Sequence, residues 1–164
     1  MTTDGPLSLH LLRHADAGDP EKWQGDDAAR PLSEKGVRQA ERLGRHLKSA
    51  EFEPDAIISS PKVRALQTAE IVGRALGVSS KTDDRLAGSL DPASVAALLR
   101  DAGGPRSPVI VGHDPDFSEL LADLTGAPNL TMKKGAIARV DLPRGVRSGE
   151  GALRWLLPPD LVPR

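Results

Sequence analysis

The fold is decided by the stretch Leu7-Ser8-Leu9-His10-Leu11-Leu12-Arg13-His14-Ala15. Its first six residues are mostly apolar, and they are followed directly by a cation and an imidazole. A short apolar run that ends at polar residues is typical of a buried strand. We therefore predict a strand over residues 7–12, with Arg13 and His14 at its carboxyl end.

Outward from this stretch, apolar runs with strand and helix patterns alternate along the chain. Further strands are predicted over residues 56–58, 108–111, 137–140 and 153–157. Helices are predicted after caps at Ser33, Ser60, Asp91 and Asp114, the first reaching about Ser49 and the second ending before Gly77. This alternation indicates an α/β fold, a three-layer α/β/α sandwich with a mostly parallel central sheet. The last two predicted strands can pair as an antiparallel hairpin.

The composition limits the classes of function. The 164 residues fit a single domain over residues 1–164, with a proline-rich tail at 158–164 that we expect to be poorly ordered. The absence of cysteine excludes disulfides, thiolate metal sites and a catalytic cysteine. The net charge of −1 and the four aromatic residues, two Trp and two Phe, argue against nucleic acid as a partner.

The same sequence predicts neither a membrane span nor a secretory signal. No apolar run approaches the ~20 residues that span a bilayer, and the polar N-terminus is unlike a secretory signal. The charge balance also argues against an anionic membrane surface as the main partner. We therefore expect a cytoplasmic protein.

Basic residues follow three of the predicted strands. Arg13 and His14 follow the first, Arg64 stands shortly after the second, and His113 follows the strand at 108–111. In open α/β sheets, ligands bind beyond the carboxyl ends of the strands. We expect these four side chains to meet in one crevice.

Two arginines and two histidines suit a tetrahedral dianion. Each guanidinium offers a planar fork of donors that matches phosphate oxygens. One neutral imidazole can attack phosphorus in line, while the other donates to an equatorial oxygen. This set supplies positioning and positive charge for phosphoryl transfer without a metal or another cofactor. No His, Asp or Glu pair shows convincing metal-ligand spacing.

Four segments, in order along the chain, resemble the histidine phosphatase (phosphoglycerate mutase-like) superfamily. They are Arg13-His14-Ala15, Arg30-Pro31-Leu32-Ser33-Glu34-Lys35-Gly36, Ser59-Ser60-Pro61 with Arg64 and Gln67-Thr68-Ala69, and Gly112-His113. The resemblance implies a phosphoglycerate mutase-like fold and phosphatase activity. It also implies that His14 is the nucleophile, and that Arg13, Arg64 and His113 hold the phosphoryl group.

Within that superfamily, the short chain, Arg30 before Pro31-Leu32 and the segment Gly135-Ala136-Ile137-Ala138 are most similar to the SixA-type branch. The resemblance implies removal of phosphate from phosphohistidine in proteins, with Arg30 facing the substrate. Two alternatives stay open. One is a small-molecule phosphatase acting on a nucleotide, sugar or other metabolite phosphate, and the other is a non-catalytic phosphate-binding module.

The source of a catalytic proton is the least defined feature. Residues 83–89 lack the Glu-bearing pattern of the mutase-like branch, and Ala15 replaces a glycine usual in the superfamily. Asp114 and Asp16 are candidate proton donors, although Asp114 before a proline also suits a helix cap. An alkoxide leaving group needs an acid, whereas an imidazole can leave near its own pKa of about 6.5. A site without a dedicated acid therefore favours phosphohistidine over an ordinary phosphoester.

Overall fold

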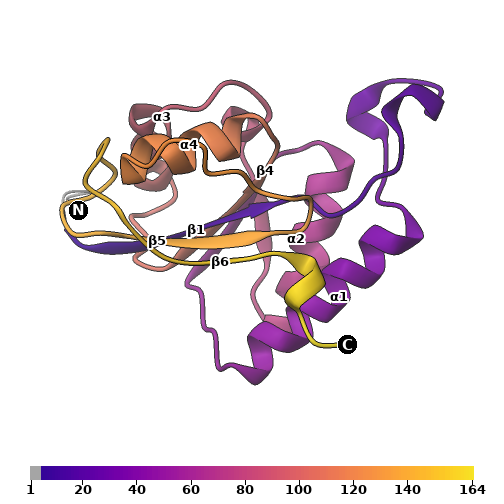
Figure 1. Cartoon of the computed structure of the whole chain (residues 1–164), viewed down its shortest axis with the longest axis horizontal. Coiled ribbons are helices and arrows are strands. Elements are labelled where there is room, and N and C mark those ends of the chain that lie inside the picture. The colour runs from indigo at the N-terminus through magenta and orange to yellow at the C-terminus, as the bar shows by residue number, and fades with distance from the viewer. Residues whose placement is uncertain (1–4) are drawn as a thin grey trace.

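The computed structural model describes residues 5–164, and a mixed sheet lies at its centre (Figure 1). Its strands are β1 (Leu7–Arg13), β2 (Ala56–Ser59), β3 (Ser80–Thr82), β4 (Pro108–Gly112), β5 (Ile137–Leu142) and β6 (Ala152–Leu157). Their spatial order is β3-β2-β4-β1-β5-β6. The first four are mutually parallel, while β5 runs antiparallel to β1 and β6 antiparallel to β5. The predicted strands and the terminal hairpin are confirmed, and β3 is a short edge strand that the sequence analysis missed.

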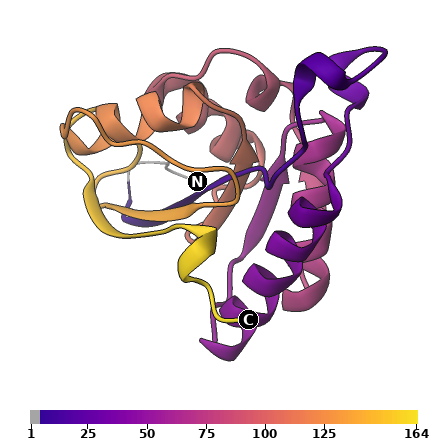
Figure 2. The same cartoon turned by 45° about the vertical axis from the view of Figure 1, so that its right-hand side comes forward.

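Helices cover both faces of this sheet, as the predicted three-layer fold requires. They are α1 (Glu34–Ser49) and α2 (Val63–Leu76) on one face, and α3 (Pro92–Asp101) and α4 (Asp116–Thr125) on the other (Figures 1 and 2). Four single 3-10 turns complete the described chain: η1 (Pro20–Lys22), η2 (Asp27–Ala29), η3 (Asp84–Ala87) and η4 (Pro159–Leu161). None of the helices in residues 5–164 has the length and apolarity needed to cross a bilayer.

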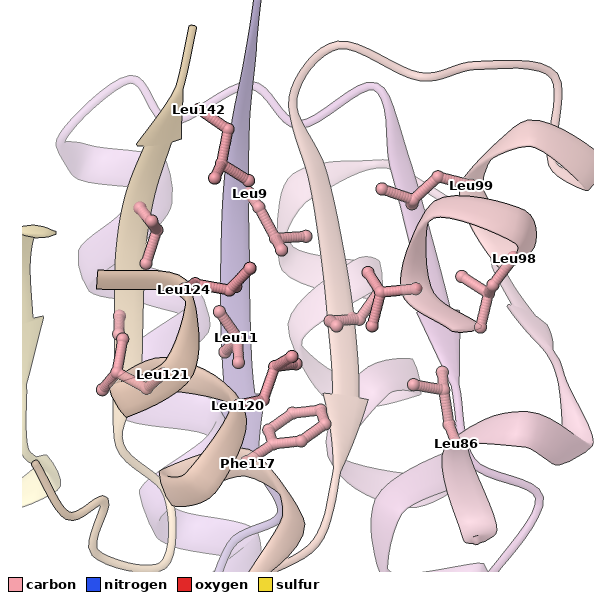
Figure 3. Packing of buried hydrophobic residues seen from close by; sticks show 14 of the residues in the cluster. Leu9, Leu11, Leu86, Leu98, Leu99, Phe117, Leu120, Leu121, Leu124 and Leu142 are labelled. Atoms are coloured by element: carbon pink, nitrogen blue, oxygen red, sulfur yellow. The ribbon is translucent and has the colours of Figure 1, made fainter. Parts of the chain in front are cut away.

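The strand that opens the chain is apolar on both sides because each side faces a helical layer. Leu9 and Leu11 belong to the core beneath α3 and α4, whereas Leu12 belongs to the core beneath α1 and α2. Figure 3 shows Leu9 and Leu11 opposite the leucines of α4, with Phe117 at the start of that helix. A Cβ on Gly112 would lie 2.7 Å from the Phe117 ring, so this strand end must be glycine.

Two helix starts differ from the prediction. The helix α2 begins at Val63, with Lys62 as its N-cap, because Ser60 still continues the sheet by donating its N–H to the carbonyl of Val111. The helix α4 begins at Asp116, and its N-cap is Pro115. The side chains of Ser60 and Asp114 still bond near these helix starts, and both also make contacts at the edge of the sheet.

The C-terminal tail contains local structure that the sequence analysis did not predict. The segment Pro159–Leu161 forms a 3-10 turn, and Val162 is buried in the apolar cluster that α1 and α2 cover. Figures 1 and 2 both place this turn beside α1. Burial of Val162 holds the segment in place, since an apolar side chain removed from water stabilises the position it occupies.

Candidate active site

The parallel strands bring the predicted site together at one edge of the sheet. Arg13 at the end of β1 is level with Gly112 at the end of β4. His14 donates its backbone N–H to the carbonyl of Gly112 at 3.0 Å, which extends the pairing by one residue. As a result, the rings of His14 and His113 lie 5.2 Å apart between centroids.

The His14 ring is held in one tautomer. Its Nδ1 lies 2.7 Å from the carbonyl oxygen of Ala15, and a carbonyl can only accept. Nδ1 therefore carries the hydrogen, and Nε2 keeps its lone pair. Burial, with smaller contributions from the positive charges of Arg64 and Arg13, lowers the pKa of His14 to about 4. At neutral pH this imidazole is uncharged and can act as a nucleophile.

His113 is the second neutral imidazole. Burial lowers its pKa to about 3, with smaller contributions from His14 and Arg64. Its Nε2 shares a 2.8 Å hydrogen bond with Oγ of Ser60, a residue with no exposed surface. The sequence analysis placed Ser60 in a family-like segment and at a helix cap, but not among the site residues. Its position directly after β2, at the sheet edge, was the signal that could have placed it in the site.

Arg64 is buried and is held by Asp27 from the long loop between β1 and α1. Nη1 of Arg64 donates to the Asp27 carbonyl at 2.8 Å, and Nη2 donates to its carboxylate at 3.0 Å. Burial lowers the pKa of Arg64. The sequence analysis missed Asp27, because nothing in a polar loop marks which acid turns inward.

Arg30 takes part in the same cluster. Its Nε donates to the other carboxylate oxygen of Asp27 at 3.1 Å, and its Nη1 donates to the carbonyl of Ala17 at 2.7 Å. The bond from Arg30, followed by the charges of Arg64 and Arg30, holds the pKa of Asp27 below its usual value. Arg30 thus links two parts of the loop between β1 and α1, with two of its three guanidinium nitrogens hydrogen-bonded to that loop.

Arg13 contacts residues on either side of α4 in the sequence. Its Nη1 donates to the carbonyl of Met132 at 2.6 Å and lies 3.6 Å from the Asp114 carboxylate. That carboxylate accepts from both the backbone N–H and the hydroxyl of Ser118, at 3.0 and 2.6 Å. Asp114 therefore caps the first turn of α4 from one residue outside the N-cap, and it also lies beside Arg13.

Asp16, the other candidate acid, is engaged by the loop. Its carboxylate accepts from the Ser33 hydroxyl at 2.6 Å and from the Gly18 N–H at 3.2 Å, and it lies 3.8 Å from Nζ of Lys134. The Ser33 bond is the largest cause of a lowered pKa for Asp16. A carboxyl that stays ionised suits a structural role better than proton donation.

Hydrogen bonds of Thr68 link the segment after His14 to Arg64, and a close backbone contact at Gly36 fixes the same segment against α1. Thr68 accepts from the Ala15 N–H at 3.1 Å and donates to the Arg64 carbonyl at 2.8 Å. A Cβ on Gly36 would lie 1.9 Å from the Asp16 carbonyl, so only glycine fits there. Ala15 is buried and is not among the described residues with positive φ, so its methyl group causes no strain.

The site contains buried side-chain nitrogens that have no hydrogen-bond partner. Within residues 5–164, the buried side-chain nitrogens and oxygens without a hydrogen-bond partner are Nε of Arg13, Nε of Arg64 and Nδ1 of His113. Buried polar atoms in native proteins are almost always bonded, so exceptions call for an explanation. Here all three belong to residues of the predicted site, and two of them are cationic donors. The arrangement can hold a phosphoryl group against His14.

Comparisons with known proteins agree with this geometry. A model of the histidine phosphatase superfamily (branch 1) matches residues 9–88. An uncharacterised protein of Picosynechococcus sp. (strain ATCC 27264) is 32% identical, over 93% of this chain and 100% of its own length. The chain belongs to the histidine phosphatase superfamily.

This histidine phosphatase is also similar to proteins of the SixA type. The phosphohistidine phosphatase SixA of Escherichia coli strain K12 is 29% identical, over 93% of this chain and 94% of its own length. A solved structure of the protein histidine phosphatase SixA complexed with tungstate superposes with a TM-score of 0.79 at 29% identity, covering 94% of this chain and 98% of that one. The predicted family and phosphoglycerate mutase-like fold are confirmed.

Proposed function

We propose that this phosphatase removes the phosphoryl group from phosphohistidine in proteins, through a phosphohistidine intermediate on His14, without a metal or other cofactor. The observation that carries the proposal is the neutral His14, with Nε2 carrying a lone pair, beside the unpartnered nitrogens of Arg13, Arg64 and His113. Phosphoryl transfer depends mainly on positioning and on stabilising negative charge, and these residues supply both.

In the first step, Nε2 of His14 attacks phosphorus in line with the bond that leaves. A P–N bond to His14 forms, the P–N bond of the substrate breaks, and its electron pair stays on the departing imidazole, which takes up a proton from solvent. In the second step, water attacks phosphorus and the bond to Nε2 breaks. Inorganic phosphate leaves, and the water proton passes to solvent. The guanidinium groups of Arg13 and Arg64 balance the phosphoryl charge throughout.

The acids near the site favour an imidazole leaving group over an alkoxide. Asp16 is held as a carboxylate by Ser33, and both oxygens of Asp114 are bonded to Ser118. An alkoxide cannot leave without a proton from a well-placed acid, but an imidazole can leave near its own pKa of about 6.5. The similarity to SixA, a phosphohistidine phosphatase, supports the same choice.

The test compares three kinds of substrate with one enzyme preparation: a phosphohistidine-bearing protein, a small phosphoramidate and a panel of phosphomonoesters. We expect the highest kcat/KM for the phosphohistidine protein and its loss in the His14→Ala variant. A higher kcat/KM for a nucleotide or sugar phosphate would make the protein a small-molecule phosphomonoesterase. Failure to turn over all three, with phosphate still bound, would make it a non-catalytic binding module.

A further inference from the structure

A hollow of about 700 Å³ adjoins the active site on the side of α1. It shares Arg13 with the phosphoryl site, and Asp16 lies on its rim beside the nucleophile segment. Its walls are one face of α1, the loop at Lys133 and Lys134, and the C-terminal turn that Figures 1 and 2 place beside α1. A substrate bound at His14 that is larger than its phosphoryl group can therefore extend over this hollow.

The hollow is strongly basic, although the chain as a whole carries a net charge of −1. Its lining includes three cations of α1, namely Lys35, Arg38 and Arg42. None of these three has a carboxylate within ion-pair distance in the part of the chain that the structure describes. Only two acids line the hollow, and each already has a lysine partner, Asp16 with Lys134 and Asp160 with Lys133.

The spacing of the three α1 cations decides what kind of anion fits. They stand at i, i+3 and i+7, which puts them along one side of the helix over about 10 Å, at 1.5 Å per residue. A single phosphate is too small to reach both ends of such a row. Acidic side chains spread along a polypeptide can meet cations at this spacing. The 700 Å³ volume also has room for several side chains.

We propose that this basic groove, formed by Lys35, Arg38 and Arg42 with Lys133 and Lys134, docks an acidic segment of the phosphoprotein substrate beside its phosphohistidine. The proposal rests on the function proposed above and adds what the enzyme recognises around the phosphorylated residue. Complementary charge raises the rate of encounter and fixes the register of the bound segment more than it adds affinity.

The test uses two synthetic phosphohistidine peptides that differ only in their flanking residues, Asp and Glu in one and Asn and Gln in the other. The readout is the ratio of kcat/KM for the acidic peptide to that for the neutral one, which is insensitive to the fraction of folded enzyme. Exposed charge pairs contribute modestly, so we expect a ratio of about 3 to 10 in the wild type. The ratio should fall toward 1 as salt is raised.

The variant R38Q/R42Q should lower the ratio to near 1 at low salt. The matched control R45Q/R74Q removes the same charge from exposed positions outside the groove and should keep the wild-type ratio. Equal turnover of both peptides by the wild type, or equal ratios in the two variants, would overturn the docking proposal alone. Failure to hydrolyse either peptide, with phosphoesters still hydrolysed, would overturn the proposed function and the docking with it. A nucleoside diphosphate affected by R38Q/R42Q while the peptides are not would make the groove a second phosphate subsite, contrary to the proposal.

Discussion

Asp27 bonds Arg64 from the side away from Nε, with its carbonyl on Nη1 and its carboxylate on Nη2. The two residues are 37 positions apart, and the second carboxylate oxygen of Asp27 is bonded to Arg30. This pairing leaves Nε of Arg64 buried without a partner. Asp27 is thus a positioning residue, which fixes the direction in which Arg64 presents its remaining donor.

We expect Asp27→Asn to lower kcat/KM by about 3- to 10-fold, since a charge-assisted hydrogen bond contributes about 1.5–3 kcal/mol when shielded and less at a half-exposed carboxylate. The measurement is steady-state kinetics on the phosphohistidine protein. Asp26→Asn is the control, because Asp26 caps the same turn and Asn preserves that cap. A rise in kcat/KM would show instead that Asp27 competes with the substrate for Arg64.

We expect a covalent intermediate on His14, because Nε2 of its ring keeps a lone pair. An enzyme sample quenched during turnover of labelled substrate should carry phosphate that acid releases and base does not. Peptide mapping should place the label on residue 14, and His14→Ala should carry none. Wild-type turnover by His14→Ala would refute the assignment of the nucleophile.

The pKa values of the two site histidines make a prediction for pH. Nitrogen chemical shifts of the imidazoles should show His14 neutral down to about pH 4 and His113 down to about pH 3. In urea, where both rings are solvated, they should titrate near 6.5. Protonation of either ring near pH 6.5 in the folded protein would contradict the structure.

These lowered pKa values also affect stability. Below about pH 6.5 the imidazoles of His14 and His113 bind protons in the unfolded chain but stay neutral in the folded protein. The free energy of unfolding therefore falls as the pH drops. The loss from these rings is complete below about pH 4 for His14 and pH 3 for His113. Urea unfolding should therefore show a smaller decline from pH 7 to pH 4 in His113→Asn than in the wild type. An equal decline would assign the acid sensitivity to other groups.

Activity should survive exhaustive treatment with EDTA, because the arginines supply the positive charge that a metal ion would otherwise provide. The measurement is kcat before and after chelation and gel filtration. Complete loss of activity, restored by Mg²⁺ or Zn²⁺, would overturn this prediction.

Asp114→Asn separates the two roles open to Asp114. If Asp114 donates a proton, turnover of alkyl phosphates should fall about 10²–10⁴-fold, and turnover of phosphohistidine should fall far less. The bonds to Ser118 favour a cap role, so we expect small and equal effects on both substrates. Asn preserves capping, so the melting temperature should change little. A large loss on both substrates at an unchanged melting temperature would mean that Asp114 orients Arg13 or the phosphate.

Much of the fold could be predicted from the sequence because hydrophobic period and turn residues agree along most of the chain. The β1 run, the Ser33 cap and the α2 stop at Gly77 are local signals, and the structure confirms all three. The start of α2 could not be read locally, because pairing of Ser60 with β4 competes with the proline signal. The order at Val162 depends on an apolar cluster assembled from distant segments.

The residues of the candidate site likewise fall into those predicted by local sequence signals and those positioned by distant segments. Arg13 ends one strand and His14 and His113 directly follow strands, so parallel pairing brings them together and the sequence predicts it. Asp27 is positioned by a loop that folds back over α2, and no periodic pattern in a loop reports that path.

The missing side chain at Gly36 has a consequence for substrate choice. Because the backbone of α1 touches the carbonyl of Asp16 there, the helix can neither slide nor tilt without disturbing the segment that follows His14. The row of cations on α1 is therefore held at a fixed distance from His14. Under the proposed docking, a partner would bind well when the separation between its acidic residues and its phosphohistidine matches the distance from the α1 cations to His14. A partner with the same charge at another spacing would bind less well.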